Sequence, residues 1–289
     1  MGMQTKRLRE VINRSGSTAS VGIWDPFSAK VAEQEGFEFL NLMGSMVSWS
    51  FLGRTDSGYI TLTEMLDVAR RVVDAVGVPI IVDCDDGFGD PMIVRRTVQL
   101  FEQVGAAGII VEDLKRPLRC SALGGGSMEP AGVMVQKVRA ALEARNDPNF
   151  VIIARTDDYE GMDEVITRVN AYGKAGADMA FVLGLKRVED MERLGKESPI
   201  PLMAVQAPGT MIPLVPPDRL ETMGYKLITY IPPIFASAAL AIRNAVRELK
   251  SGLKDGTRVP SIAPGFTPME IEEIVGLPQD TELQKKYHV

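Results

Sequence analysis

The stretch Gln103-Val-Gly-Ala-Ala-Gly-Ile-Ile-Val-Glu-Asp113 contains the pattern that decides the fold. It follows a segment, Met92–Val104, whose apolar residues recur at spacings of three and four, as in an amphipathic helix. Gly105 then stands where a helix ends, a position that favours the left-handed conformation other residues resist. The short apolar run Gly108–Val111 comes next and predicts a buried strand. Helix, glycine and strand thus form one unit of the predicted fold.

The same unit recurs along the chain. Glycine precedes an apolar run again at Gly36, Gly176 and Gly224. Helical spacing is also found in four further segments, Leu62–Val76, Met134–Ala144, Met162–Ala175 and Val188–Leu194. Eight apolar runs are predicted as strands: Val21–Trp24, Phe39–Met43, Val78–Val82, Gly108–Val111, Phe150–Ala154, Met179–Leu183, Pro201–Val205 and Lys226–Tyr230. This alternation predicts an α/β fold, a closed (β/α)8 TIM barrel, with an open doubly wound sheet as the alternative.

The length of 289 residues suits one barrel, although length alone also allows two domains. We predict a (β/α)8 barrel catalytic domain over residues 1–251. A helical run, Ile234–Ser251, a Pro- and Gly-rich stretch, Gly252–Pro268, and a helical segment, Met269–Val275, follow the last strand. Residues 252–289 are therefore predicted to form a C-terminal arm and helix that pack on a neighbouring subunit, or alternatively cap the chain's own barrel.

Composition excludes several classes of protein. Hydrophobic residues make up 45% and charged residues 24% of the chain, as in ordinary globular proteins. The net charge of −6 comes with no concentrated basic stretch, which argues against a nucleic-acid partner. No signal segment or apolar run of about 18 residues is present, so no membrane association is predicted. The two cysteines, Cys84 and Cys120, form no spaced framework, and we expect a cytoplasmic protein.

Carboxylates follow the third and fourth predicted strands, in Asp83-Cys-Asp-Asp-Gly-Phe-Gly89 and in Glu112-Asp113. The carboxyl ends of barrel strands share one rim, where active sites lie. Several carboxylates on one rim would repel each other, so a bound cation or facing arginines are expected. Carboxylates with few histidines favour magnesium over zinc. The alternative interpretation is that Asp-Asp-Gly only forms a turn.

Arg155 follows the fifth predicted strand, which would place its guanidinium on the same rim. Its planar fork could bind a substrate carboxylate through two hydrogen bonds, or it could simply neutralise Glu112 or Asp157. The only histidine, His288, stands at the end of the chain, which excludes a catalytic triad unless the tail reaches another active site.

Acid–base chemistry therefore falls to carboxylates, tyrosines, lysines, water or Cys120. Lysine and arginine residues in 115–119 would lower the pKa of the Cys120 thiol, and the glycine run 124–126 predicts a mobile lid. The alternative is an inert thiol in a flexible loop.

These motifs resemble those of the isocitrate lyase and phosphoenolpyruvate mutase superfamily. The matching motifs are Asp83–Gly89, Glu112-Asp113, Arg119-Cys120 and Ala154-Arg-Thr-Asp157, in the family's order and spacing, and the resemblance runs from Trp24–Lys30 to Gly224-Tyr225. It implies an α/β barrel whose eighth helix is swapped between subunits, in a homotetramer built as a dimer of helix-swapped dimers. It also implies Mg²⁺ as the cofactor, with Mn²⁺ as an alternative.

The resemblance implies roles for named residues. Asp85 would bind the metal directly, and Asp83 and Glu112 directly or through water. The substrate-binding residues would be Trp24, Gly44, Ser45, Met46 and Arg155, and the catalytic residues Asp56, Cys120 and Arg155. The family's chemistry forms or breaks C–C or P–C bonds beside a metal-bound 2-oxo acid or its enolate.

Departures from the family pattern narrow the function. Ser121 and Ala122 follow Cys120 where the lyases have Gly-His, and Gly126 replaces the lid lysine. The sixth strand ends without a glutamate, and Gln206 stands where the lyases have asparagine.

We therefore predict a magnesium-dependent carbon–carbon lyase acting on a small 2-hydroxy or 2-oxo di- or tricarboxylate of the methylisocitrate or dimethylmalate kind, with standard methylisocitrate cleavage disfavoured. The alternatives are an oxaloacetate-type decarboxylase or 2-oxo acid hydrolase, a phosphonate mutase, and a non-catalytic metabolite-binding barrel.

Overall fold

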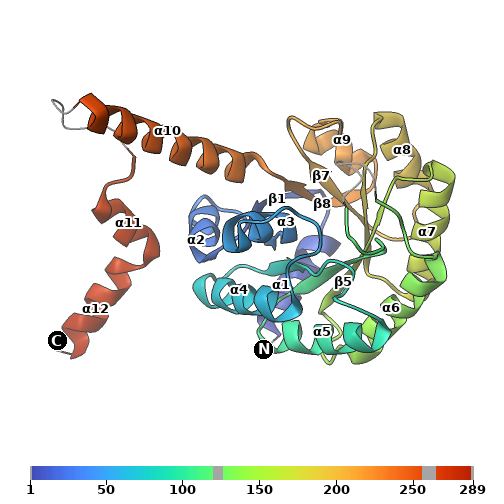
Figure 1. Cartoon of the computed structure of the whole chain (residues 1–289). Coiled ribbons are helices and arrows are strands. Elements are labelled where there is room, and N and C mark those ends of the chain that lie inside the picture. The colour runs from blue at the N-terminus through green and yellow to red at the C-terminus, as the bar shows by residue number, and fades with distance from the viewer. Residues whose placement is uncertain (1, 120–125, 256–264, 288–289) are drawn as a thin grey trace. The chain divides into compact units, whose positions relative to one another are not determined.

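Eight parallel strands close into a barrel in their sequence order (Figure 1). The computed structural model describes residues 2–119, 126–255 and 265–287. The strands are β1 (Thr18–Ile23), β2 (Leu40–Leu42), β3 (Ile80–Asp83), β4 (Gly108–Glu112), β5 (Val151–Asp157), β6 (Met179–Leu183), β7 (Leu202–Gln206) and β8 (Tyr225–Tyr230). β1 also pairs with β8 in parallel, which closes the barrel and confirms the predicted (β/α)8 fold.

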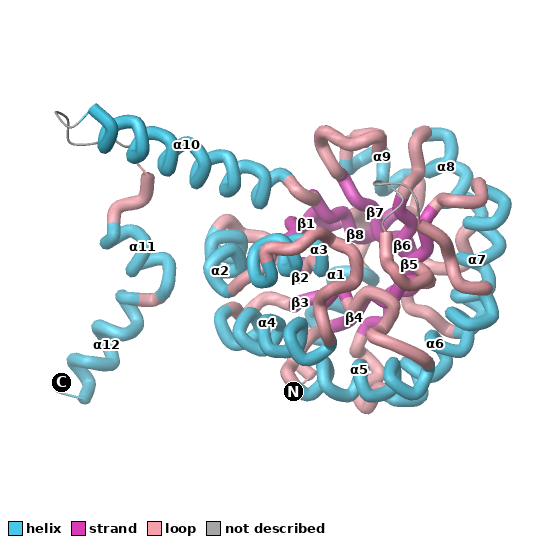
Figure 2. Tube along the Cα trace, viewed as in Figure 1, coloured by secondary structure: helices cyan, strands magenta, loops and turns pink. Residues whose placement is uncertain are grey.

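Helices connect the strands and surround them on the outside (Figure 2). They are α2 (Pro26–Gln34), α4 (Leu62–Ala75), α5 (Pro91–Gln103), α6 (Ala131–Ala144), α7 (Met162–Ala175), α8 (Val188–Glu197) and α9 (Pro217–Thr222). Between β2 and α4 lie a short α3 (Gly44–Val47) and one π-helical turn, η1 (Ser48–Leu52). Gly105 and Gly176 have φ of 89° and 102°, so the predicted left-handed glycines do end α5 and α7.

The core has two layers. Side chains inside the barrel, among them Phe39 and Phe181, form one buried cluster, and the outer faces of β6–β8 pack on α7, α8 and α9 in another. An N-terminal helix that the sequence did not predict, α1 (Met3–Asn13), adds Leu8, Val11 and Ile12 to the interior cluster. Arg9 donates to the Asn149 carbonyl before β5, and Gln4 donates to the Gly77 carbonyl before β3. Helix α1 therefore covers the amino ends of the strands and leaves the carboxyl ends for a site.

A second compact unit, Pro233–Val289, follows the barrel unit Met1–Pro232. It contains α10 (Pro233–Asp255), α11 (Pro268–Val275) and α12 (Leu277–Tyr287). The predicted helices Ile234–Ser251 and Met269–Val275 are thus present, whereas α12 was not predicted. α10 carries exposed apolar side chains, including Ile242 and Val246, which are 65% and 59% exposed. The domain boundary after residue 251 and packing on a neighbouring subunit stay predictions.

Across the ranges the structure describes, no helix combines the length and the apolar character that crossing a membrane requires.

Candidate active site

Three buried carboxylates gather at the carboxyl ends of β3 and β4. Asp83 and Glu112 are the last residues of these strands, and Asp85 follows two residues after Asp83. Asp83 accepts the Gly44 N–H through Oδ2 at 3.2 Å and the Asp85 N–H through Oδ1 at 3.4 Å. Asp85 Oδ2 is buried without a hydrogen-bond partner among the described residues. A buried acceptor of this kind is costly to leave unpaired, so Asp85 Oδ2 is suited to bind a cation.

The turn after β3 explains how these carboxylates are presented. Asp85 has φ of 47°, an unusual conformation for a side-chain-bearing residue, and Gly87 has φ of 82°. The Gly87 N–H donates to the Cys84 carbonyl at 2.8 Å, and a Cβ on Gly87 would lie 2.5 Å from Val94 Cγ2. Asp-Asp-Gly therefore does form a turn, and that same turn directs Asp85 into the barrel mouth.

Arg155, on β5, lies beside the carboxylate cluster. Its Nη1 is 2.8 Å from Glu112 Oε2 and its Nε is 3.1 Å from Asp157 Oδ1. The guanidinium carbon lies 5.6 Å from the centre of the Phe181 ring, and the side chain is only 8% exposed. Arg155 therefore does neutralise Glu112 and Asp157, which was the alternative that the sequence left open. The same two ion pairs fix the orientation of its guanidinium.

One small pocket is lined by the three predicted metal ligands together with Asp56 and Arg155. It is lined by Asp56, Asp83, Asp85, Glu112, Leu114, Leu118, Arg119 and Arg155. Its free volume of about 10 Å³ is close to the least that holds one water molecule.

The carboxylates of this pocket are poorly suited to carry charge by themselves. Burial, then repulsion by Asp83, raises the pKa of Asp56 to about 6, while Arg155 opposes the shift. Burial likewise raises the pKa values of Asp83, Asp85 and Glu112, and at Asp85 the neighbouring Asp83 and Asp56 add to the increase. A cation among these groups would lower all four pKa values.

The residues fit a hard divalent cation. In the described part of the chain, no three His, Cys, Asp or Glu side chains are gathered closely enough to hold a metal ion among themselves. Mg²⁺ keeps several waters and is usually bound through one or two carboxylates. The unpartnered Asp85 Oδ2 fits a direct ligand of this kind.

The segment expected to bind the substrate begins α3. The Gly44 N–H is already donated to Asp83, and a Cβ on Gly44 would lie 3.1 Å from Asp85 Oδ1, so a larger residue there would press on the carboxylates. Ser45 is half-buried, whereas the Met46 side chain is fully buried and would lie 2.9 Å from a Cβ on Gly22. Met46 could therefore reach a substrate only through its backbone.

Trp24 is not among the described residues that line this pocket. Trp24 follows β1 and lines a separate hollow of about 340 Å³, together with Phe51 and Arg71. Cys120 and His288 lie outside the described residues.

Asp86 and Asp113, the other two carboxylates that follow these strands, are paired with arginines, which the sequence had offered as an alternative to a bound cation. Asp86 is paired with Arg116, and Asp113 Oδ2 accepts Arg168 Nη1 at 2.9 Å and the Tyr172 hydroxyl at 2.5 Å. No local pattern could have revealed Arg168, because it is 55 residues from Asp113 in the chain. Leu114 and Leu118 are further lining residues that sequence reasoning missed, and Arg119, which the sequence singled out only as part of a motif, lines the pocket as well.

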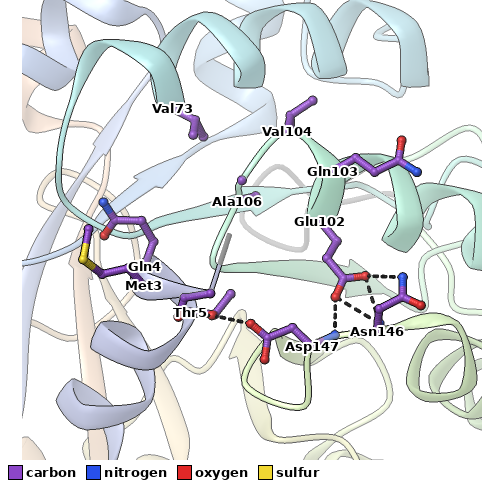
Figure 3. A pocket seen from close by; sticks show the side chains of 12 residues that line it. Met3, Gln4, Thr5, Val73, Glu102, Gln103, Val104, Ala106, Asn146 and Asp147 are labelled. Carbon is purple, nitrogen blue, oxygen red and sulfur yellow. Dashed lines mark hydrogen bonds between the residues drawn. The ribbon is translucent and has the colours of Figure 1, made fainter.

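A roomier hollow of about 650 Å³ lies at the other end of the barrel (Figure 3). Thr5 on α1, Glu102 on α5 and Asp147 before β5 line it, and Glu102 accepts N–H groups from Asn146 and Asp147. It contains none of the predicted catalytic residues, so size alone does not identify the active site.

The arrangement matches a known family. A family model described as phosphoenolpyruvate phosphomutase matches residues 8–250. The chain belongs to this family. The expectation of an enzyme of the phosphoenolpyruvate mutase/isocitrate lyase superfamily is thereby confirmed.

Named relatives cover nearly the whole chain. A 2,3-dimethylmalate lyase of Eubacterium barkeri is 34% identical, over 97% of both chains. A 2-methylisocitrate lyase of Aeropyrum pernix is 32% identical, over 96% of this chain and 91% of the relative. An oxaloacetate decarboxylase of Paraburkholderia xenovorans is 29% identical, over 98% of this chain and 93% of the relative.

Solved structures agree. Oxaloacetate acetylhydrolase in complex with 3,3-difluorooxalacetate superposes with a TM-score of 0.91 at 29% identity, over 99% of this chain and 97% of the other. Phosphonopyruvate hydrolase in complex with oxalate and Mg²⁺ superposes with a TM-score of 0.84 at 25% identity, over 99% of both chains.

Proposed function

We propose that this chain is a magnesium-dependent carbon–carbon bond lyase that cleaves a small, substituted malate-like 2-hydroxy dicarboxylate. The observation that carries the proposal is Asp85, whose buried Oδ2 has no hydrogen-bond partner among the described residues, in one pocket with Arg155. This pairing offers one group for a cation and another for a carboxylate. The similarity to 2,3-dimethylmalate lyase supports this substrate class.

Asp85 would hold the cation directly, and Asp83 and Glu112 would hold it directly or through water. A bound Mg²⁺ would supply a Lewis acid that stabilises negative charge on a substrate oxygen. The related structure with oxalate and Mg²⁺ supports this assignment, with Mn²⁺ as an alternative ion.

Arg155 would bind a substrate carboxylate. Glu112 and Asp157 hold its Nη1 and Nε and so orient the planar group before the substrate arrives. The backbone N–H groups of Ser45 and Met46, in the first turn of α3, and the Ser45 hydroxyl would bind the oxyanionic end of the substrate. Trp24 is kept as a proposed substrate contact on the family resemblance alone.

Cleavage requires one proton acceptor and one proton donor. The substrate hydroxyl loses its proton, the C2–C3 bond breaks, C2 becomes a carbonyl carbon, and C3 takes the electron pair and then a proton. Asp56, with a pKa of about 6, is mostly ionised at neutral pH and can accept the hydroxyl proton. Cys120 is proposed to protonate C3.

The carboxyl ends of β6 and β7 favour a dicarboxylate over a tricarboxylate. Leu183 and Gly184 provide no charged group after β6. Gln206, which ends β7, uses its Oε1 to accept the Val215 N–H at 2.8 Å and its Nε2 to donate to the Val205 carbonyl at 3.2 Å. Its amide is thus occupied by the protein.

The same features also suit an oxaloacetate decarboxylase or hydrolase, which is the second candidate. The relatives that carry those names support it. A phosphonate mutase is less well supported, because no described group in the pocket is specific for phosphorus.

A substrate screen with Mg²⁺ tests the proposal. Purified enzyme is assayed against 2,3-dimethylmalate, 2-methylisocitrate, citramalate, oxaloacetate and phosphonopyruvate. Turnover of a 2-hydroxy dicarboxylate supports the lyase, and turnover of oxaloacetate alone supports the second candidate.

Cys120→Ser separates the two candidates further. A lyase that needs the thiol as an acid should lose about 10²-fold or more in kcat, whereas a decarboxylase can take its proton from water. Activity of the variant within about threefold of wild type would refute the lyase.

Assembly and location complete the proposal. We propose a homotetramer formed by helix-swapped dimers in the cytoplasm, with neither nucleic acid nor membrane as a partner. The exposed apolar residues of α10 support a contact with another copy of the chain.

A further inference from the structure

Arg116 joins three loops around the pocket. It lies in the connection between β4 and α6, and its Nε and Nη2 donate to both carboxylate oxygens of Asp86, at 3.0 and 2.7 Å. Asp86 belongs to the connection between β3 and α5. The remaining nitrogen, Nη1, donates to the Gly58 carbonyl at 3.0 Å, in the connection between β2 and α4. A single guanidinium therefore bridges three consecutive connections at the carboxyl ends of the strands.

Asp86 is itself held firmly. It is 6% exposed, its Oδ1 also accepts the Phe88 N–H at 3.1 Å, and its carbonyl accepts Lys137 Nζ at 2.6 Å. Lys137, on α6, is 5% exposed, so this contact anchors the loop from within the protein. Arg116 thus forms its ion pair with a buried carboxylate whose loop is held in place, not with a carboxylate on the surface.

The backbone conformation and the close packing at position 58 favour glycine, whose carbonyl accepts from Arg116. Its φ is 71°, and a Cβ there would lie 3.0 Å from both Arg116 Nη1 and Leu118 Cγ. Leu118 in turn lines the pocket beside Asp56, which stands two residues before Gly58. The loop that carries Asp56 is therefore attached to the rest of the site through Arg116 and Leu118.

We propose that Arg116 is a positioning residue that holds the Asp56 loop against the loop of Asp85. This inference rests on the proposed function, because it assigns Asp56 a role in catalysis. Only a fork with several N–H groups can satisfy both oxygens of Asp86 and the Gly58 carbonyl at once, which a lysine ammonium on a flexible stem cannot do in this geometry.

Arg116→Lys is the first test, with Arg95→Lys as the matched control. Arg95 does not line the pocket and forms one ion pair, with 2.9 Å between its Nη1 and Glu143 Oε2. Its side chain is 35% exposed, compared with 43% for the side chain of Arg116. Arg116→Lys should lose between about 10-fold and 100-fold in kcat, the scale expected for a misplaced catalytic group. KM and the melting temperature should change little, and Arg95→Lys should match wild type.

Hydrogen exchange gives a readout that needs no substrate. Amides in residues 53–60 should exchange faster in Arg116→Lys than in wild type or Arg95→Lys. Unchanged exchange in this segment would overturn the proposal, whatever the enzyme's substrate. Faster exchange with unchanged kcat would also overturn it, because the contacts of Arg116 with Asp86 and Gly58 would then not position a reacting group.

A double-mutant cycle identifies the partner. Arg116→Gln, Asp86→Asn and the double variant should show similar losses in kcat, because each breaks the same contact. Additive losses would contradict action through Asp86. If wild type turns over no carboxylate, the proposed function fails. The exchange data still show whether Arg116 holds the loop of residues 53–60.

Discussion

Asp85→Asn should make the metal-free protein more stable while abolishing its activity. The substitution keeps the size of the side chain and removes a charge that is 7% exposed, has one unpartnered oxygen among the described residues, and faces Asp83 and Asp56. A buried polar group without a partner costs about 1–3 kcal/mol, and more when it is charged. The asparagine amide is still unpaired, so only the added cost of the charge is removed, which we take as about 1–3 kcal/mol. Removal of the charge should therefore raise the melting temperature by about 2–6 °C, at roughly 2 °C per kcal/mol for a chain of this size.

Magnesium should reverse the order of stability. At a concentration 100 times its Kd, a ligand of the folded state adds about 2.7 kcal/mol. Wild type should therefore gain roughly 5 °C in saturating Mg²⁺ at that scale, and Asp85→Asn should gain almost nothing. Scanning calorimetry or a thermal-shift assay, with and without chelator, measures both effects.

The effect of pH has a definite sign. The pKa of Asp85 is raised in the folded protein, so the folded state binds a proton that the unfolded state has already released. Wild type therefore loses stability as pH rises above the unfolded-state pKa of Asp, about 3.9. The advantage of Asp85→Asn should grow with rising pH and disappear in acid.

Asp113→Asn is the matched control. Asp113 is also buried, and its Oδ1 likewise has no hydrogen-bond partner among the described residues, but its Oδ2 is bonded to Arg168 and Tyr172. Loss of its charge should lower stability by about 1–3 kcal/mol and leave the response to magnesium intact. If Asp85→Asn destabilises the metal-free protein as Asp113→Asn does, or still responds to Mg²⁺ like wild type, our reasoning about Asp85 is wrong.

Three further predictions concern the reaction and the assembly. Because Asp56 must be ionised to accept a proton, kcat/KM should fall as pH drops through about 6, or slightly below once a cation is bound. Asp56→Asn should remove this acidic limb of the pH profile together with most of the activity. A flat profile from pH 5 to 8 would contradict a role for Asp56 as the proton acceptor. Arg155→Lys keeps the charge but loses the fork bound to Glu112 and Asp157, so kcat/KM should fall by about 10²-fold or more; near-wild-type steady-state kinetics would exclude carboxylate binding by Arg155. Truncation after Gly252 should change the oligomeric state measured by light scattering, and a monomeric full-length chain would rule out helix swapping.

The sequence alone determined the barrel and the position of its reactive rim. Alternation of apolar strands with amphipathic helices has a period that is readable along the chain, and the left-handed glycines Gly105 and Gly176 are local requirements of the backbone. Asp83, Asp85, Glu112 and Arg155 lie in or just after the carboxyl ends of β3, β4 and β5, so barrel topology alone brings them to one end.

Only the tertiary structure decided which charges are paired. Asp85 and Asp86 are neighbours in sequence, yet one has an unpartnered oxygen and the other is held by Arg116, 30 residues away. In the same way Glu112 faces the pocket and Asp113 is bonded to Arg168 on α7. Successive residues at the end of a strand point to opposite sides, and their partners come from distant elements. Pairing therefore depends on packing between helices and loops, which leaves no local trace in the sequence.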